Sequence, residues 1–373
     1  IDVGAEYDIW LLHHADGHPL TRVRDYASLQ YAKVVNDVGS FTLVVPFTFD
    51  ISLIQRDTRL VVYRTPPGGA KALDFVGMVR YVSKEVRGQA LNYIVAGCDL
   101  NDLLRRRIIA YAAGAAQSAM TDNADDMMKA IVVDNMGADA VAARQITSYG
   151  FSIQADTSLC TSITKAFAHM NVLETLKKFA DESQTTPATA AYFGVVPLST
   201  GWLCEFRTNV NQWGADHRHP SGPAGPVIFS LSFRNLENVT RNINYRAEVT
   251  YVYAGGKGEG AARYIGVAED TARSGASPFN RCEAFVNASN ADTNAAVTGA
   301  ASSAVRDGRP RRLFSANITS VGSRIYGRDF GHGDYITCVF DGETIDARID
   351  AVAVNISGNV EDVQMLVREE TTA

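Results

Sequence analysis

The chain has 373 residues, of which 46% are hydrophobic and 20% charged, and its formal net charge is −6. This length and composition allow two or three compact domains and exclude a wholly disordered protein. The negative charge argues against a protein that wraps nucleic acid, because phosphate contacts need clustered Lys and Arg. No apolar run reaches 18 residues and the first ten residues show no signal-peptide pattern, so we expect a soluble protein made in the cytoplasm without membrane insertion.

Residues 1–100 are predicted to form a β domain. Runs of β-branched and aromatic residues, such as YDIWLL, SLQYAKVVNDVGSFTLVVP and RLVVYR, are separated by turns rich in Gly, Pro and Asp. This pattern is typical of short strands. We expect about six antiparallel strands here.

Residues 101–226 are predicted to be an α+β insertion domain. Asn171 and Glu174 have the spacing of a capping box at the start of one helix. Another helix is expected where five apolar side chains share one stripe: Ala124, Met127, Met128, Ile131 and Val132. The stretches AYFGVVP and WLCEFRT predict a hairpin, and the tract 214–226, rich in Pro, Gly and His, predicts a linker.

Residues 227–373 are predicted to form a second β domain with one Ala-rich helix over 290–307, capped by Asp292 or Thr293. A strand is expected over 245–253. The clearest hairpin joins YITCVF to ETIDARIDAVAVNI through Asp341–Gly342. Alternation in its second strand predicts a dry face and a wet face, namely Ile345, Ala347, Ile349, Ala351 and Ala353 against Thr344, Asp346, Arg348 and Asp350. The fold class is therefore mainly β with an α+β insertion.

The glycine-rich segment between two predicted strands looks at first like a phosphate-binding loop: Gly255, Gly256, Lys257, Gly258, Glu259 and Gly260. A Walker A loop would need a Ser or Thr after its lysine, whereas Lys257 precedes Gly258. The dinucleotide pattern also fails, because the glycines alternate at a spacing of two and no helical pattern follows. We predict a flexible hairpin tip in which glycine permits positive φ.

No catalytic or metal-binding constellation is recognisable, and we expect no cofactor. Five histidines lie in loops or in the linker, without a Cys or Glu at ligand spacing: His13, His14, His18, His217 and His219. Helix ends exposed to solvent explain the remaining charged candidates, which are Asp125, Asp126, Asp181, Glu182 and the run Arg105–Arg107. The five cysteines form no C-x-x-C pair, which indicates reduced, buried thiols.

Six stretches, in chain order, resemble a family of tail proteins of long non-contractile-tailed phages and related prophages: YDIWLL, SLQYAKVVNDVGSFTLVVP, DLNDLLRRRIIAYAAG, NVLETLKKFAD, EVTYVYAGGKGEGAARYIGVAEDTARSGASPFNRCEAFVNAS and YGRDFGHGDYITCVF. The resemblance is to baseplate hub proteins, similar in fold to the central trimeric hub of contractile tails. It implies two tail-tube-like β-barrel or sandwich domains per chain, so that three chains place six similar domains around a lumen.

The resemblance also implies a structural role at the tail tip of the virion. A homotrimer would join the distal tail or tube protein to fibre or spike proteins, with the tape measure protein as a further neighbour. Double-stranded DNA would pass through its lumen without specific binding. Residues 255–260 would then make a subunit contact through main-chain hydrogen bonds.

Two other classes of function stay open. A tail-associated cell-wall hydrolase needs paired carboxylates or a metal triad that converge in a cleft. A carbohydrate-binding tail-tip module exposes aromatic side chains along a shallow groove, for which Trp202 and Trp213 are the candidates.

Overall fold

The computed structural model describes residues 4–87, 90–110, 118–167, 169–183, 190–289, 291–318, 324–358 and 360–369. The chain divides into a large unit, made of Ile1–Thr240 with Phe314–Ala373, and a small unit, Arg241–Leu313. The division into domains 1–100, 101–226 and 227–373 stays a prediction. Within the described ranges, no helix combines the length and apolarity needed to cross a membrane.

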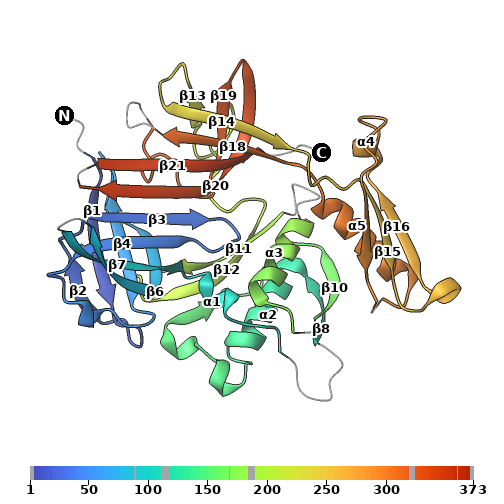
Figure 1. The fold of residues 1–373 in the computed structure, drawn as a ribbon, viewed down its shortest axis with the longest axis horizontal. Helices are drawn as coiled ribbons and strands as arrows, with labels where there is room; N and C mark the ends of the chain where they lie inside the picture. Colours follow the sequence, from blue (N-terminus) through green and yellow to red (C-terminus); the bar gives the residue numbers. More distant parts are fainter. Residues whose placement is uncertain are drawn as a thin grey trace. The chain divides into compact units, whose positions relative to one another are not determined.

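The N-terminal part of the large unit is a run of antiparallel strands, as expected from its sequence (Figure 1). The pairs β1–β2, β3–β4, β5–β6 and β6–β7 join strands that follow each other in the chain, whereas β1 with β5 and β4 with β7 join strands that do not. The strands are β1 (Glu6–Leu12), β2 (Pro19–Val23), β3 (Ser28–Val34), β4 (Ser40–Pro46), β5 (Arg59–Thr65), β6 (Ala72–Arg87) and β7 (Ala90–Asp99).

Strands from the C-terminal part of the chain extend the same sheet. They are β13 (Ile228–Ser230), β14 (Leu236–Asn244), β18 (Arg311–Ile318), β19 (Tyr335–Phe340), β20 (Glu343–Ser357) and β21 (Val360–Glu369). The strand order is β14-β18-β21-β20-β3-β4-β7-β6-β5-β1-β2. This confirms the mainly β fold. Among the described strands the path stays open, with β14 at one end and β2 at the other, so it does not close into a barrel.

The hairpin of β19 and β20 forms as predicted, because Asp341 and Gly342 both take positive φ in its turn. The predicted alternation along β20 is wrong beyond its middle. The register with β21 shifts between Ile349 and Ala351, and this bulge moves the buried side chains onto the even-numbered positions from Val352 onward. Arg348 and Asp350, both expected to be exposed, are also buried.

The insertion packs helices against short strands and confirms the predicted α+β character. Its elements are α1 (Asp102–Arg105), β8 (Ser118–Asn123), α2 (Ala124–Met136), β9 (Phe151–Ile153), β10 (Ser162–Phe167), α3 (Val172–Ser183), β11 (Ala191–Pro197) and β12 (Cys204–Val210). The five apolar residues predicted to line α2 are all buried. The Asn171 side chain accepts a hydrogen bond from the Glu174 amide at 3.3 Å, as its cap position predicts.

The large unit has two hydrophobic cores on opposite faces of its sheet. Leu60 and Val62 of β5 face the first core, which the C-terminal strands complete, whereas Val61 faces the second core. The second core holds the apolar sides of α2 and α3. Alternate residues of β5 therefore pack against the C-terminal strands on one face of the sheet and against the insertion on the other.

The tract 214–226 is not a free linker. The His217 amide donates to the Tyr335 carbonyl at 2.8 Å, and the His217 carbonyl accepts from the Val227 amide at 2.8 Å. The Gly214 amide donates to the Gly333 carbonyl at 3.1 Å. These bonds hold the tract along β19, and its Pro and Gly content reflects turns within a fixed segment.

The small unit is a three-stranded sheet in the order β16-β15-β17, covered on one face by a helix (Figure 1). Its elements are β15 (Tyr251–Gly255), β16 (Ile265–Glu269), α4 (Thr271–Ser274), β17 (Glu283–Asn287) and α5 (Asn294–Asp307). Thr293 caps α5 by accepting from the Ala296 amide. The strand predicted over 245–253 is too long at its start: residues 245–250 form a turn and loop, because the Glu248 amide bonds back to the Tyr245 carbonyl and the Val249 amide bonds to the Gly308 carbonyl.

Candidate functional site

The glycine segment is the loop of a β-hairpin, as predicted. β15 and β16 pair antiparallel from Tyr251 opposite Glu269 to Gly255 opposite Ile265. Main-chain bonds continue beyond the strands, with the Gly256 amide donating to the Tyr264 carbonyl at 2.8 Å. The role of residues 255–260 as a subunit contact stays a prediction.

The loop has a buried base and an exposed tip. Gly255 and Gly256 are buried, whereas residues 257–260 are exposed. A Cβ on Gly256 would lie 2.5 Å from Val297 Cγ2 and 2.6 Å from the Ala291 carbonyl oxygen, so this glycine permits close packing under α5. The amides of Gly256 and Lys257 already donate to carbonyl groups. These two amides at the base of the loop are therefore not available to a phosphate.

An apolar surface lies on the face of the small-unit sheet opposite α5. We call it the aromatic face and define it as Tyr251, Tyr253, Ile265, Val267 and Phe285. Its central row is continuous, because Tyr253 pairs with Val267 on one side and with Phe285 on the other. Phe285 is 58% exposed, Val267 46% and Tyr253 37%. A row of large exposed apolar side chains on a small sheet is typical of a surface that a partner covers.

Charged side chains border the aromatic face. The Arg281 guanidinium lies 3.8 Å from the centre of the Tyr251 ring, and the Arg263 guanidinium lies 5.5 Å from that of Phe285. Arg281 also pairs with Glu283 at 2.7 Å. An aromatic centre with arginine and carboxylate groups at its rim has the composition of a protein interface.

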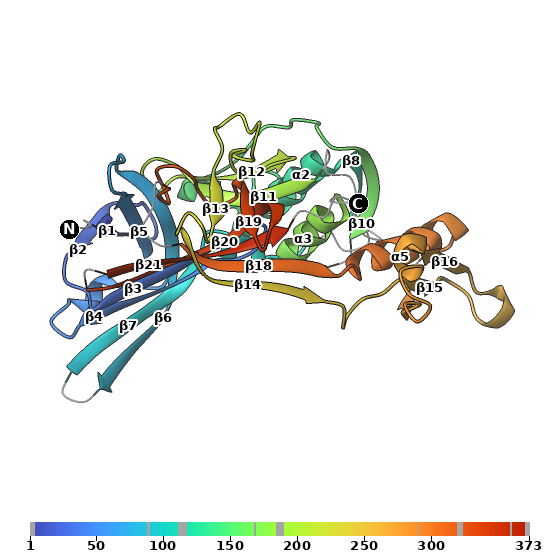
Figure 2. The same ribbon diagram turned by 90° about the horizontal axis from the view of Figure 1, so that it is seen from above.

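The hairpin of β6 and β7 carries further exposed apolar side chains, which were not predicted from the sequence. Figure 2 shows this hairpin reaching past the neighbouring strands of the sheet. Four apolar side chains on it are well exposed, with fractions of 58%, 42%, 65% and 42% in turn: Tyr81, Val82, Val86 and Leu91. β6 is unusually long and spans Ala72–Arg87. The correspondingly long run of strand-forming residues is the sequence feature that could have revealed these exposed side chains.

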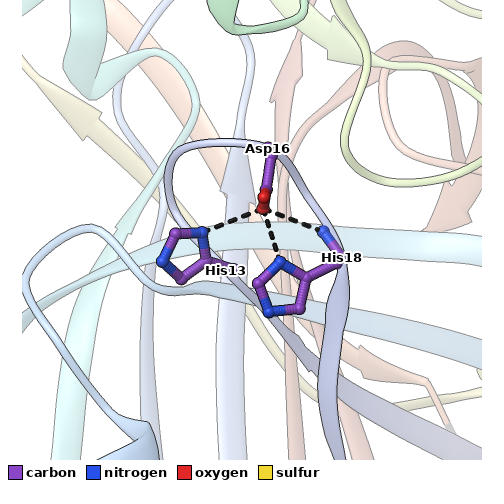
Figure 3. Close-up of side chains that lie close together, drawn as sticks. All are labelled: His13, Asp16 and His18. Atoms are coloured by element: carbon purple, nitrogen blue, oxygen red, sulfur yellow. Dashed lines mark hydrogen bonds and ion pairs between the residues drawn. The ribbon is translucent and has the colours of Figure 1, made fainter.

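Three side chains in the turn between β1 and β2 converge on one point (Figure 3). His13 Nδ1 and His18 Nδ1 lie 2.9 and 2.6 Å from the same oxygen, Asp16 Oδ1. Sequence analysis named both histidines and missed Asp16. His14 contacts the His13 ring but contributes no atom to this cluster.

Asp125 and Asp126, predicted to be solvated, are buried, and both carboxylates bind the loop 157–160. Asp125 accepts from the Cys160 amide at 2.9 Å, and Asp126 accepts from the Thr157 amide at 2.8 Å. Burial raises the pKa of each carboxyl group, but these hydrogen bonds outweigh burial and lower the pKa below its ordinary value. Their role is to hold a loop, and they do not face each other across a cleft.

The other charged candidates that the sequence offered are explained by their exposure or by ion pairs within the protein. Arg105 is exposed as predicted, whereas Arg106 reaches Asp57 at 2.9 Å. Asp181 is half-buried, and the side chain of Glu182 lies outside the described residues.

A cavity of about 150 Å³ in the large unit is lined by two half-buried carboxyl groups, Asp74 and Asp99. Asp74 accepts hydrogen bonds from Tyr31, Lys33 and Tyr326. Asp99 accepts from two backbone amides, and burial raises its pKa to about 7. Both carboxyl groups accept hydrogen bonds from the protein itself, so this cavity does not present the acid/base pair that a hydrolase needs.

The tryptophan and cysteine side chains also serve packing. Trp202 packs under Gly17 and Gly150, whereas Trp213 packs against Gly333 and lines the cavity of about 150 Å³ beside Asp74 and Asp99. The described cysteines form no disulfide, and Cys160, Cys204 and Cys338 are buried whereas the other two are half-buried. Burial raises the pKa of Cys338 to about 12, which makes it a poor nucleophile.

Comparison with known proteins identifies the family. The siphovirus ReqiPepy6 Gp37-like protein family matches residues 9–364. The chain belongs to this family of siphovirus tail proteins. It is therefore a structural component of a siphovirus or prophage tail. None of the curated protein sequences matches this chain.

Solved structures of tail proteins share the fold of this tail protein. The tail protein from Neisseria meningitidis MC58 is 14% identical, with a TM-score of 0.57 over 97% of this chain and 96% of that one. The 43 kDa tail protein of prophage MuSo2 from Shewanella oneidensis is 11% identical, with a TM-score of 0.58 over 97% and 98%. Prophage tail protein gp18 from Listeria monocytogenes EGD-e is 12% identical, with a TM-score of 0.52 over 98% and 95%.

Proposed function

We propose that this tail protein is a baseplate hub: a homotrimer that forms a ring around the tail channel at the tail tip. The ring joins the distal tail or tube protein to fibre or spike proteins and leaves a lumen through which DNA passes. The tape measure protein is a further neighbour in this proposal. A structural role of this kind needs surfaces for neighbouring subunits and no catalytic residues.

The aromatic face of the small unit is the observation that carries the proposal. Its exposed row of Tyr253, Val267 and Phe285 would lose water contact on association, which is favourable at about 25 cal/mol per Å² of apolar surface. Among the described residues, β16 and β17 each pair with β15 alone, so both outer edges of this sheet are open. An open edge beside an apolar face suits the addition of a strand from another subunit.

The exposed tip at residues 257–260 lies at the end of this same hairpin, and we propose that it contacts the neighbouring subunit. Gly258 and Gly260 take φ of +102° and +54°, which a side chain disfavours. The buried Gly256 serves the isolated fold and is unsuited to testing assembly. The tip glycines and the aromatic face are the parts to test.

The test replaces Phe285 with Asp, which places a charge in the exposed row of the aromatic face and removes only the partly exposed contact of this ring with Arg263. We expect Phe285→Asp to fold normally and to be absent from assembled tails in a complementation assay. Phe279→Asp is the matched control, because Phe279 is in the same unit, is 92% exposed and lies outside the aromatic face. Normal incorporation of Phe285→Asp would contradict the proposed contact.

Copy number tests the ring itself. A density map of the intact tail tip should show three copies of this chain around the channel axis, and a single copy or a ring of six would contradict the trimer. The hydrolase alternative predicts that the purified chain clears suspensions of bacterial cell walls. We expect no clearing, because Asp126, Asp99 and Asp74 accept hydrogen bonds from backbone amides or hydroxyl groups of the protein itself.

A further inference from the structure

We infer that the turn between β1 and β2 binds one divalent transition-metal ion of the zinc class through His13, Asp16 and His18. The residues belong to one turn of the large unit and lie outside the surfaces proposed for assembly. The inference therefore stands or falls independently of the hub proposal.

The ligand atoms already lie close to a coordination geometry. The two histidine Nδ1 atoms and the Asp16 carboxylate oxygen all lie within 4.8 Å of one another. Zinc binds histidine nitrogen and carboxylate oxygen at about 2.0–2.2 Å, so tetrahedral coordination separates such ligand atoms by roughly 3.3 Å. Each Nδ1 lies 2.9 or 2.6 Å from Asp16 Oδ1. A small outward movement of the exposed Asp16 and His18 side chains is therefore enough to admit an ion.

The backbone that carries these ligands is fixed. The His13 amide donates to the His18 carbonyl at 2.9 Å, and the Gly17 amide donates to the His13 carbonyl at 3.0 Å. Gly17 has a φ of +73°, and the Trp202 ring fills the space where its Cβ would lie. Packing and hairpin bonds thus hold the ligands on a preorganised support, which lowers the entropy cost of binding.

In this cluster several hydrogen-bond donors surround one acceptor atom, the Asp16 carboxylate oxygen. Asp16 Oδ1 is approached by both imidazole nitrogens and by the His18 amide at 3.3 Å. The Ala15 amide lies 3.4 Å from His13 Nδ1, where it would need a lone pair on the same nitrogen that faces Asp16. A bound cation relieves the crowding at Asp16 Oδ1, because the two imidazole nitrogens and the carboxylate oxygen then each direct a lone pair at the ion.

The ligand set selects the class of metal. Two imidazoles and one carboxylate suit zinc, cobalt and nickel, whereas magnesium and calcium favour oxygen ligands throughout. The side chains of Asp16 and His18 are 62% and 54% exposed. The solvent side of the ion would thus stay open to water or to a ligand from another protein.

Calorimetry on the full chain with Zn²⁺ tests the site, and Co²⁺ absorption reports the coordination. We expect one ion per chain, with affinity at least about tenfold lower in His18→Ala and in Asp16→Asn. His14→Ala is the control and should bind as the unaltered chain does, because its ring lies outside the ligand set. Ca²⁺ should give no saturable binding.

Two results would overturn the inference. One is the absence of saturable Zn²⁺ binding by the unaltered chain, and the other is one-to-one binding that both His18→Ala and Asp16→Asn retain. Circular dichroism checks the fold of each variant. Asp16→Asn keeps the size of the side chain and thereby preserves a folded test case.

Discussion

Replacing Glu361 with Gln should destabilise the large unit strongly, because Glu361 neutralises a buried guanidinium. Arg64 donates to both carboxylate oxygens of Glu361, from Nε at 2.7 Å and from Nη2 at 2.8 Å. The Arg64 side chain is only 4% exposed and that of Glu361 14%. Burial lowers the pKa of Arg64, but Glu361 and Tyr7 outweigh it and raise the pKa on balance.

The size of the effect follows from leaving Arg64 charged without its carboxylate. Removing one partner of a buried ion pair costs about 3–5 kcal/mol, against a total stability of about 5–15 kcal/mol for a folded protein. A neutral amide cannot supply the lost charge, and one of its two groups is a donor that faces the Arg64 donors. We expect a large fall in the urea midpoint of Glu361→Gln.

Two further variants make the measurement decisive. The apolar pair Arg64→Met with Glu361→Leu should recover most of the lost stability, because it removes both charges together. Glu283→Gln, in an exposed pair with Arg281, should leave the midpoint unchanged. If Glu361→Gln shifts the midpoint no more than Glu283→Gln does, the pair is screened by solvent and the reasoning is refuted.

Three smaller changes test other parts of the fold. Burial raises the pKa of Asp99 to about 7, so the folded state keeps a proton that the unfolded chain has lost. Stability should therefore fall between pH 4 and pH 7 by up to about 1.4 kcal/mol per pH unit, and the urea midpoints of Asp99→Asn should lack this slope. Val297→Ala should cost about 1–3 kcal/mol through a cavity in the small core, seen as faster hydrogen exchange in α5. Thr293→Ala should cost about 1 kcal/mol by the same measurement, through loss of the helix cap.

Helices were predictable from the sequence because their signals are local. The stripe along α2 and the caps at Asn171 and Thr293 all lie within a few residues of the helices that they specify. The turn at Asp341 and Gly342 was predictable for the same reason, since both residues tolerate positive φ.

Strand limits and burial depended on distant partners. The register shift in β20 is set by its pairing with β21 and β3, and no residue near Ile349 predicts it from the sequence. Asp126 at a helix start was compatible with solvent until the loop 157–160 folded over it. The cluster at Asp16 is different: the pattern H-x-x-D-x-H around a tight turn was present in the sequence.

The pairing of β3 with β20 also has a consequence for folding during synthesis. Tyr31 lies opposite Val354, so a strand near the start of the chain obtains its second neighbour only after almost all of the chain has been synthesised. Until then, one edge of the N-terminal sheet has unpaired main-chain groups beside apolar residues such as Leu29. Contacts this distant slow folding and lengthen the period in which nascent chains can aggregate. Expression at low temperature and with chaperones should therefore raise the soluble yield of this protein.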